Sequence, residues 1–400
     1  MTFIEYFKEN FLKTFHILLK KQKSYSLENK YYTEYISFKE FDNQKEKIFH
    51  DLLDNLNKKQ YFPSDLHPIL IPKSDNSLRL ICISSIQDKI IQKLILKYIR
   101  EHHEDKYKIS TKADFSSRKT EGGALRARVQ ALSYRNTYSH ILKTDISSFF
   151  DNLDRNKIKE NIVNYLQIPE IDFILNKIVD MDIRLPPKNS SGLTHEQYKL
   201  LSSKQGKGIR QGMPIASFIS SLYLYEFDNF LQIRNINYVR YADDLIISCS
   251  SHNEAKSIYK DIIKELKKLH LDIPSLEDET KTKIVQNASI DFLGLDFEYT
   301  GSSFKSIIPL RVFNKVEEKL DAYDTLNKNI KSKRNFFDVI QELNYIRNGY
   351  NSAFSDAANI NDLINLIDQE KVLIISKLLG SIGINVNNLS IRKKKFFFDL

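Results

Sequence analysis

Two neighbouring carboxylates, Asp243 and Asp244, lie between two short apolar runs of the sequence. The runs, 238–241 before and 245–248 after, are rich in β-branched and aromatic residues, which predicts a β-hairpin with the carboxylates at its turn. Like charges this close repel each other, and burying them is costly. A solvated surface turn would avoid that cost, whereas a bound divalent cation would offset it. Carboxylate-held metal pairs of this kind clamp the oxygens of a phosphoryl transfer.

A third carboxylate, Asp145, ends an apolar run that begins at His140. The run predicts a strand, followed by a turn and a helix. If this strand neighbours the hairpin in one sheet, Asp145 meets the carboxylate pair. Phe150 follows five residues later. Its ring would lie either under the sugar of an incoming nucleotide or, as for most Phe residues, in the core.

Upstream, two apolar strands flank a polar turn at 74–77, with Lys73 and Arg79 on either side. Two cations on a β-ribbon suit a triphosphate, because Lys acts as a point charge and Arg binds oxygens as a fork. An ordinary charged hairpin explains the same pattern. Residues 107–136 are polar and basic, and they include Arg118. They fit either template phosphates or a loop followed by a basic helix.

A Pro/Ser/Lys-rich stretch, 184–205, is predicted to be a loop. It leads to a glycine-rich segment that contains Gln211 and Gly212, and then to an apolar helix that reaches Leu231. Glycines ahead of a Pro-started helix allow close backbone contact with a ligand. Alone, such a segment is a weak indication of phosphate binding.

The chain has 400 residues, of which 42% are hydrophobic, so it can form about two or three domains with sizeable cores. Its net charge of +9 suits a polyanionic partner. Cys82 and Cys249 lie in apolar runs and form neither a disulfide framework nor a zinc site. We find no signal-peptide pattern and no apolar run near the roughly 20 residues that span a membrane, so a cytoplasmic protein is expected. Amphipathic periodicity after residue 306 predicts a helical module, followed by the basic, Phe-containing tail 392–398.

In this order, the segments resemble those of bacterial reverse transcriptases, over roughly residues 60–300. The upstream segment is similar to the fingers of retron and group II intron enzymes. The resemblance rests on Pro72-Lys73 with Arg79, Asp145 to Phe150, Gln211-Gly212-x-Pro214, Tyr241 to Asp244 and Phe292-Leu293-Gly294. It implies an α+β right-hand polymerase fold, with an antiparallel palm sheet that carries the catalytic Asp residues. The implied parts are a helical extension over 1–60, fingers and palm over 61–305, and a helical thumb with a basic tail over 306–400.

The resemblance also implies roles for single residues. Asp145 and Asp243 would hold two Mg²⁺ ions, for which Mn²⁺ can substitute, with Asp244 beside them and the Ile146 carbonyl completing one site. Lys73 and Arg79 would bind the triphosphate, and Phe150 would exclude a ribose 2′-hydroxyl. Gln211 would contact the incoming nucleotide or its template base, and Lys281 would donate a proton to the leaving pyrophosphate. Template or primer binding would fall to Arg118, Gly212 and Tyr241. The substrates would be dNTPs and an RNA template, and the product DNA.

One departure is Arg210, where relatives usually have Pro before Gln. Retron marks, a Cys/His-rich endonuclease module and an RNase H pattern are not evident. By elimination, the chain most resembles stand-alone reverse transcriptases of phage defence, which commonly work with a small noncoding RNA, while some prime on protein or polymerise without an ordinary template. A protein effector or a homo-oligomer is the further partner that this resemblance suggests. The alternatives are a retron-type enzyme that makes msDNA, a template-independent or protein-primed DNA polymerase, and a catalytically idle RNA-binding protein.

Overall fold

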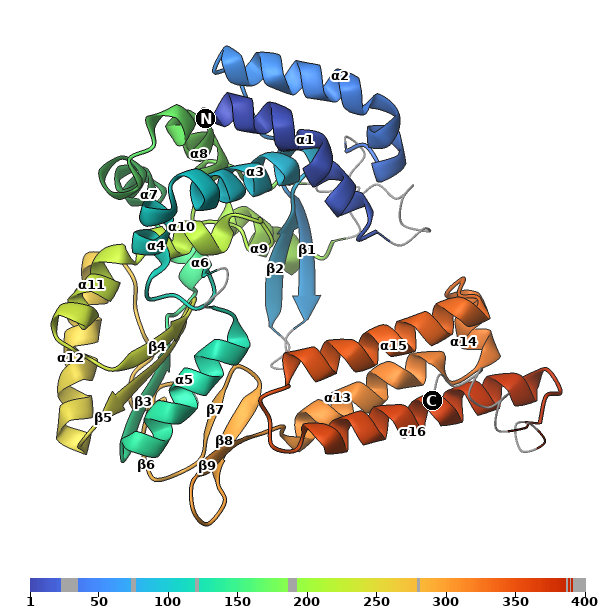
Figure 1. The fold of residues 1–400 in the computed structure, drawn as a ribbon. Helices are drawn as coiled ribbons and strands as arrows, with labels where there is room; N and C mark the ends of the chain where they lie inside the picture. Colours follow the sequence, from blue (N-terminus) through green and yellow to red (C-terminus); the bar gives the residue numbers. More distant parts are fainter. Residues whose placement is uncertain are drawn as a thin grey trace. The chain divides into compact units, whose positions relative to one another are not determined.

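The computed structural model of the chain describes residues 1–22, 35–72, 77–118, 122–185, 193–278, 281–385, 388 and 390. Its contacts divide the chain into two compact units (Figure 1). The first unit comprises Met1–Glu121, Lys143–Ile246 and Lys256–Lys283, and the second comprises Gly122–Leu142, Ile247–Ala255 and Ile284–Leu400. Lys73 and the basic tail from residue 391 lie outside the described residues.

The chain begins with two helices, α1 (Phe3–Leu19) and α2 (Phe38–Asn57), which pack against each other. Thr2 and Ser37 begin these helices with complete capping boxes, in which the side chain and the backbone of the first turn bond reciprocally. Between the helices, aromatic rings lie within contact distance and supply much of the packing. These rings belong to Phe7, Phe11, Phe15, Phe41 and Phe49.

Strands β1 (His67–Pro72) and β2 (Leu78–Ile83) form the expected antiparallel ribbon. Ile71 pairs with Arg79 near the turn, and Arg79 is exposed. The helices between β2 and the last strand of the next sheet are α3 (Ile86–His102), α4 (Glu104–Thr111), α5 (Ala124–Thr137), α6 (Phe149–Asn152), α7 (Arg155–Asn161), α8 (Pro169–Val179), α9 (His195–Lys204), α10 (Ala216–Tyr223), α11 (Tyr225–Ile233) and α12 (His252–Lys268), with a π-helical turn at Ile162–Leu166.

A four-stranded sheet runs in the order β4-β5-β3-β6 (Figure 1). Its strands are β3 (His140–Asp145), β4 (Tyr238–Tyr241), β5 (Asp244–Cys249) and β6 (Lys283–Gln286). Strand β5 is buried along nearly its whole length, as expected of an apolar strand between two neighbours. Because β3 and β5 are adjacent, the strand that ends on Asp145 neighbours the strand that begins at Asp244.

Two local expectations prove wrong in this region. The stretch 184–205 contains helix α9, which begins with a capping box between Thr194 and Gln197. The apolar stretch that reaches Leu231 is two helices, because Leu224 leaves helical geometry between α10 and α11.

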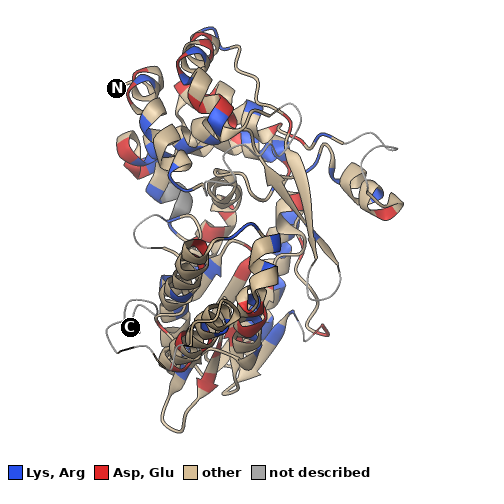
Figure 2. Cartoon of the chain, turned by 90° about the vertical axis from the view of Figure 1, so that its right-hand side faces the viewer, with Lys and Arg blue, Asp and Glu red and all other residues tan. Residues whose placement is uncertain are grey.

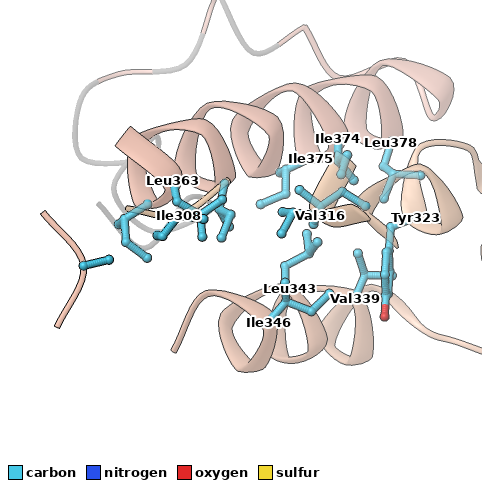
Figure 3. Close-up of a cluster of buried hydrophobic side chains, with 14 of the residues drawn as sticks. Ile308, Val316, Tyr323, Val339, Leu343, Ile346, Leu363, Ile374, Ile375 and Leu378 are labelled. Carbon is cyan, nitrogen blue, oxygen red and sulfur yellow. The ribbon is translucent and has the colours of Figure 1, made fainter. Parts of the chain in front are cut away.

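The second unit contains a three-stranded sheet and a helical module. The sheet consists of β7 (Ile290–Phe292), β8 (Leu295–Tyr299) and β9 (Phe304–Ile307), in that order. The module consists of α13 (Leu310–Leu320), a 3₁₀ turn (Asp321–Tyr323), α14 (Leu326–Lys331), α15 (Phe336–Ala353) and α16 (Ile360–Ser381). Figure 3 shows its core, in which Val316, Leu343 and Ile375 point toward one another. The expectation of amphipathic helices after residue 306 is therefore confirmed.

The charged residues of the chain are not confined to one element. Figure 2 shows Lys and Arg on helices throughout the described chain, interspersed with Asp and Glu. Within the described residues, the basic side chains are therefore not confined to one segment. In the part of the chain that the structure describes, no helix is both long and apolar enough to cross a bilayer.

Candidate active site

The end of β3 and the turn of the β4–β5 hairpin are joined by a backbone hydrogen bond. The Ile146 N–H donates to the Asp243 carbonyl at 3.1 Å. Asp145, Asp243 and Asp244 are all half-buried, at the ends of neighbouring strands. The sequence-predicted carboxylates are therefore brought together by two adjacent strands of one sheet.

The electrostatics of Asp243 reflect this proximity. Burial raises the pKa of its carboxyl group, and the negative charge of Asp145 raises it further, whereas the cation of Arg79 opposes the shift. The ionised form of such a carboxyl group is disfavoured, and a nearby cation stabilises it. The same shift indicates that Arg79, on the β1–β2 ribbon, lies within electrostatic reach of the carboxylates.

The donor set fits a divalent cation of the hard, oxygen-binding class. Carboxylates with a raised pKa, such as Asp243 beside Asp145, are ligands that Mg²⁺ accepts, and Mg²⁺ characteristically completes its shell with water and substrate phosphates. Among the described residues, no group of three His, Cys, Asp or Glu side chains is arranged to hold a metal ion. With Asp145 and Asp243 as protein ligands, Mg²⁺ would complete its shell with backbone oxygen, water and substrate phosphates.

Lys281 lies just before β6, the neighbour of β3 in the sheet. Its side chain is exposed, and its backbone N–H donates to the Asp278 carbonyl at 3.0 Å. Lys281 therefore lies at the end of the sheet at which β3 ends on Asp145.

The glycine-rich segment 206–212 packs on the backbone of α6. A Cβ atom added to Gly208 would lie 2.3 Å from the Phe150 carbonyl oxygen and 2.6 Å from that of Asp151. The Ile209 N–H donates to the same Phe150 carbonyl at 2.8 Å. Phe150 itself is half-buried, so it is neither fully exposed to solvent nor fully buried in the core. The segment thus fixes the backbone that presents this ring.

The other end of the segment is fixed on β2. The Cys82 N–H donates to the Gln211 carbonyl at 2.7 Å, and a Cβ atom added to Gly212 would lie 2.3 Å from the Cys82 carbonyl oxygen. Gly212 has a φ of +100°, which favours glycine. Gln211 keeps a half-buried side chain beside the strand that carries Arg79. One loop therefore links the candidate nucleotide-binding residues of β2 and α6.

Arg210 has a structural role that sequence reasoning did not assign. Its side chain is 1% exposed and forms ion pairs with Asp182 at 3.2 Å and Asp151 at 3.6 Å. It also donates to the Lys204 carbonyl, and Lys204 pairs with Asp151 at 2.7 Å. The unusual residue before Gln211 is thus a buried cation that holds the loop to the residue after Phe150.

Two of the three candidate template and primer residues, Arg118 and Tyr241, belong to segments at the β4–β5 hairpin, whereas Gly212 packs on β2. Tyr241 ends β4 and is half-buried. The guanidinium of Arg118 lies 4.3 Å from the ring centroid of Phe115, and an isolated bridge pairs Asp114 with Arg240. The structure therefore brings the segment of Arg118 to β4, whereas Lys73 lies outside the described residues.

The family model for reverse transcriptase (RNA-dependent DNA polymerase) matches residues 71–297, more than half of the chain. The chain belongs to this reverse transcriptase family. It is therefore an RNA-directed DNA polymerase with the α+β right-hand fold. The match spans all the half-buried carboxylates described above.

The solved structures to which the chain is similar include two telomerases, both with low TM-scores. Telomerase from Candida albicans in complex with a TWJ fragment of telomeric RNA is 16% identical, with a TM-score of 0.37 over 86% of this reverse transcriptase and 70% of that chain. Telomerase from Candida tropicalis with the same kind of fragment is 13% identical, with a TM-score of 0.41 over 88% and 68% of the two chains. The comparison with curated proteins gives no match.

Proposed function

We propose that this reverse transcriptase extends DNA by two-metal nucleotidyl transfer, with Asp145 and Asp243 as the ligands of two Mg²⁺ ions. Mn²⁺ would serve in the same place. The observation that carries the proposal is the juxtaposition of the two carboxylates, which the Ile146–Asp243 backbone bond fixes and the raised pKa of Asp243 reflects. Asp244 stands beside them as a third carboxylate, and the Ile146 carbonyl completes one site. Bound divalent cations would neutralise the charge that develops on the phosphoryl oxygens.

The reaction itself is an in-line displacement. The primer 3′-hydroxyl gives its proton to water as its oxygen bonds to the α-phosphorus of a dNTP. The bond from that phosphorus to the oxygen that bridges to the β-phosphorus breaks, and pyrophosphate leaves. Arg79 and Lys73 hold the triphosphate in line. Lys281 gives its proton to the leaving pyrophosphate, a role that its exposed position at the sheet end favours.

Phe150 and Gln211 select the nucleotide. Phe150 excludes a ribose 2′-hydroxyl with its ring, and Gln211 contacts the incoming nucleotide or its template base. The segment 206–212 contains Gln211 and bonds to β2 through the Gln211 carbonyl, and its Ile209 N–H bonds to the Phe150 carbonyl. Arg118, Gly212 and Tyr241 bind template or primer by phosphate and sugar contacts, which set register without reading sequence.

We propose the parts of the chain on the same resemblance. The helical extension occupies 1–60, fingers and palm 61–305, and thumb with basic tail 306–400. The separate core of α13, α15 and α16 supports a thumb of its own. Duplex product lies on that module.

In the cell, we propose a stand-alone defence enzyme of the cytoplasm that copies a small noncoding RNA, with a protein effector or a second copy as partner. The support is the resemblance of its motifs to those bacterial enzymes. Untemplated or protein-primed synthesis is the second candidate. The unusual Arg210 motivates it, because Arg210 precedes Gln211, the proposed contact of the incoming nucleotide or its template base. A retron-type product is a third candidate.

The test begins with the protein purified from its native locus and sequencing of the nucleic acids that accompany it. One small RNA with complementary DNA supports templated synthesis, whereas DNA without a complement, or DNA attached to protein, supports the second candidate. The double variant Asp243→Ala/Asp244→Ala should lose incorporation while RNA binding persists. Synthesis by that variant would overturn the metal assignment, and RNA binding without any wild-type synthesis would favour an idle RNA-binding protein.

A further inference from the structure

A fully buried arginine lies two residues before the turn of the carboxylate hairpin. Arg240 is on β4 between Val239 and Tyr241, and its side chain is 0% exposed. A buried guanidinium is costly unless it is paired and hydrogen-bonded. Its partners are Asp114, also 0% exposed, and Asp228, 7% exposed. These three charges form a closed cluster inside the first unit.

The guanidinium of Arg240 contacts both carboxylates of the cluster. Arg240 Nε donates to Asp228 Oδ1 at 2.9 Å, a second guanidinium nitrogen donates to the other oxygen of Asp228, and Nη1 lies 3.3 Å from Asp114 Oδ2. Burial would lower the pKa of Arg240, but the two carboxylates raise it above its ordinary value. The guanidinium therefore stays charged and available as a donor.

The cluster forms hydrogen bonds with both the backbone N–H and the carbonyl of Ala242, the first residue of the turn. The Ala242 N–H donates to Asp114 Oδ1 at 3.0 Å, and Arg240 Nη1 donates to the Ala242 carbonyl at 3.1 Å. Ala242 has a φ of +55°, the left-handed conformation that is unfavourable for a residue with a Cβ atom. The two side chains thus hold a strained backbone whose next residue is Asp243.

Asp114 is itself anchored to a second element. The Ser117 hydroxyl donates to Asp114 Oδ2 at 2.9 Å. The same hydroxyl contacts the Ser217 carbonyl of α10 at 2.7 Å. The Phe115 N–H donates to the Arg240 carbonyl at 3.0 Å. The turn is therefore tied to the segment that carries Arg118, by side chain and by backbone.

We infer that Asp114 and Arg240 are positioning residues that hold Ala242 in its left-handed conformation and thereby aim the Asp243 carboxylate at the metal site. The inference rests on the proposed function, because it assumes that Asp243 binds metal. Both side chains are 0% exposed and so are closed to a substrate. They fix the backbone conformation of Ala242, which sets the orientation of the Asp243 carboxylate. That orientation in turn affects metal affinity and the rate of the chemical step.

The test compares Asp114→Ala, Asp114→Asn and a matched control, Asp88→Asn. Asp88 is another fully buried carboxylate, hydrogen-bonded to Tyr61 and Ser85. Asp114→Ala should lower kcat about 100-fold, since misplacement of a reacting group by about 1 Å costs this much, with little change in KM for dNTP. Asp114→Asn keeps an acceptor for the Ala242 N–H and should lie between Asp114→Ala and wild type. Asp88→Asn should lose heat stability but not kcat.

A second readout does not depend on turnover. Mn²⁺ binding measured by electron paramagnetic resonance, without nucleotide, should weaken about tenfold in Asp114→Ala and stay unchanged in Asp88→Asn. A rescue variant tests the backbone directly. Ala242→Gly removes the penalty of positive φ, so Asp114→Ala/Ala242→Gly should regain about tenfold in kcat over Asp114→Ala.

The outcomes separate the inference from the proposed function. If folded Asp114→Asn and Asp114→Ala keep wild-type kcat and Mn²⁺ affinity, or if Ala242→Gly gives no rescue, the inference is overturned. If Asp114→Ala does not fold, Asp114→Asn decides between the same results. If Asp243→Ala/Asp244→Ala binds Mn²⁺ as wild type does, the proposed function itself fails.

Discussion

The hydroxyl oxygens of Thr144 and Thr282 lie 2.7 Å apart in the interior of the first unit, as a hydrogen-bonded pair. Asp145 follows the first threonine, and Lys281 precedes the second. The bond therefore fixes the spacing between a proposed metal ligand and the proposed proton donor, although neither threonine reaches the substrate. It joins two residues that are 138 positions apart in the chain.

Replacing Thr282 with Val should destabilise the protein by about 1–2 kcal/mol, because the buried Thr144 hydroxyl loses its partner while the volume stays nearly constant. Chemical denaturation measures this loss. The double variant Thr144→Val/Thr282→Val should recover part of it, since no polar atom is then left unpaired. A single variant as stable as wild type would show that water replaces the bond.

Gly212→Ala should abolish most activity, because the new Cβ atom would overlap the Cys82 carbonyl and push the loop off β2. We expect a loss of about 100-fold in kcat/KM. The matched control is Gly301→Ala, which has a similarly positive φ of +91° but nothing within 4 Å of the new atom. Equal losses in the two variants would attribute the effect to backbone strain rather than to the contact with β2.

Phe150→Ala should admit ribonucleotides, since the proposed barrier to the 2′-hydroxyl is removed. The ratio of kcat/KM for dNTP to that for the matching ribonucleotide should fall by about 100-fold. Phe150→Tyr, which keeps the ring, is the control and should discriminate as wild type does. An unchanged ratio in Phe150→Ala would return this side chain to a packing role.

Arg210→Gln should weaken the same discrimination indirectly. Removing the buried cation leaves Asp151 and Asp182 without their shared partner and frees the loop from the residue after Phe150. Because both carboxylates are partly exposed, we expect only about 1–2 kcal/mol of destabilisation. The selectivity ratio should fall about tenfold. A loss of stability with full selectivity would limit Arg210 to folding.

Local pattern was sufficient to predict the hairpin of Asp243 and the strand that ends on Asp145, because period-two apolar runs and turn residues are properties of adjacent positions. It was also sufficient for the amphipathic helices after residue 306. The capping box of α9 was readable as well, but the prolines and serines around it favoured a loop. The break at Leu224 left no such signal, since both helices are apolar.

The contacts that organise the site could not be predicted in the same way. The bond from Ala242 to Asp114 spans 128 positions, and no spacing rule relates the two residues. One signal was present. A charged residue, Arg240, stands between apolar neighbours in a strand, and such a residue requires a buried partner. The sequence indicates that a partner exists without indicating which carboxylate it is.

Each of the two units is composed of three separate stretches of chain, which has a consequence during synthesis on the ribosome. Strand β3 emerges about 100 residues ahead of its neighbour β5, so it waits roughly 5–20 s for a partner at ordinary translation rates. During that interval its apolar residues are open to wrong pairing or to a chaperone. The polymerase site cannot form on a nascent chain until β6 has been made, and no single cut divides the chain into two self-sufficient halves.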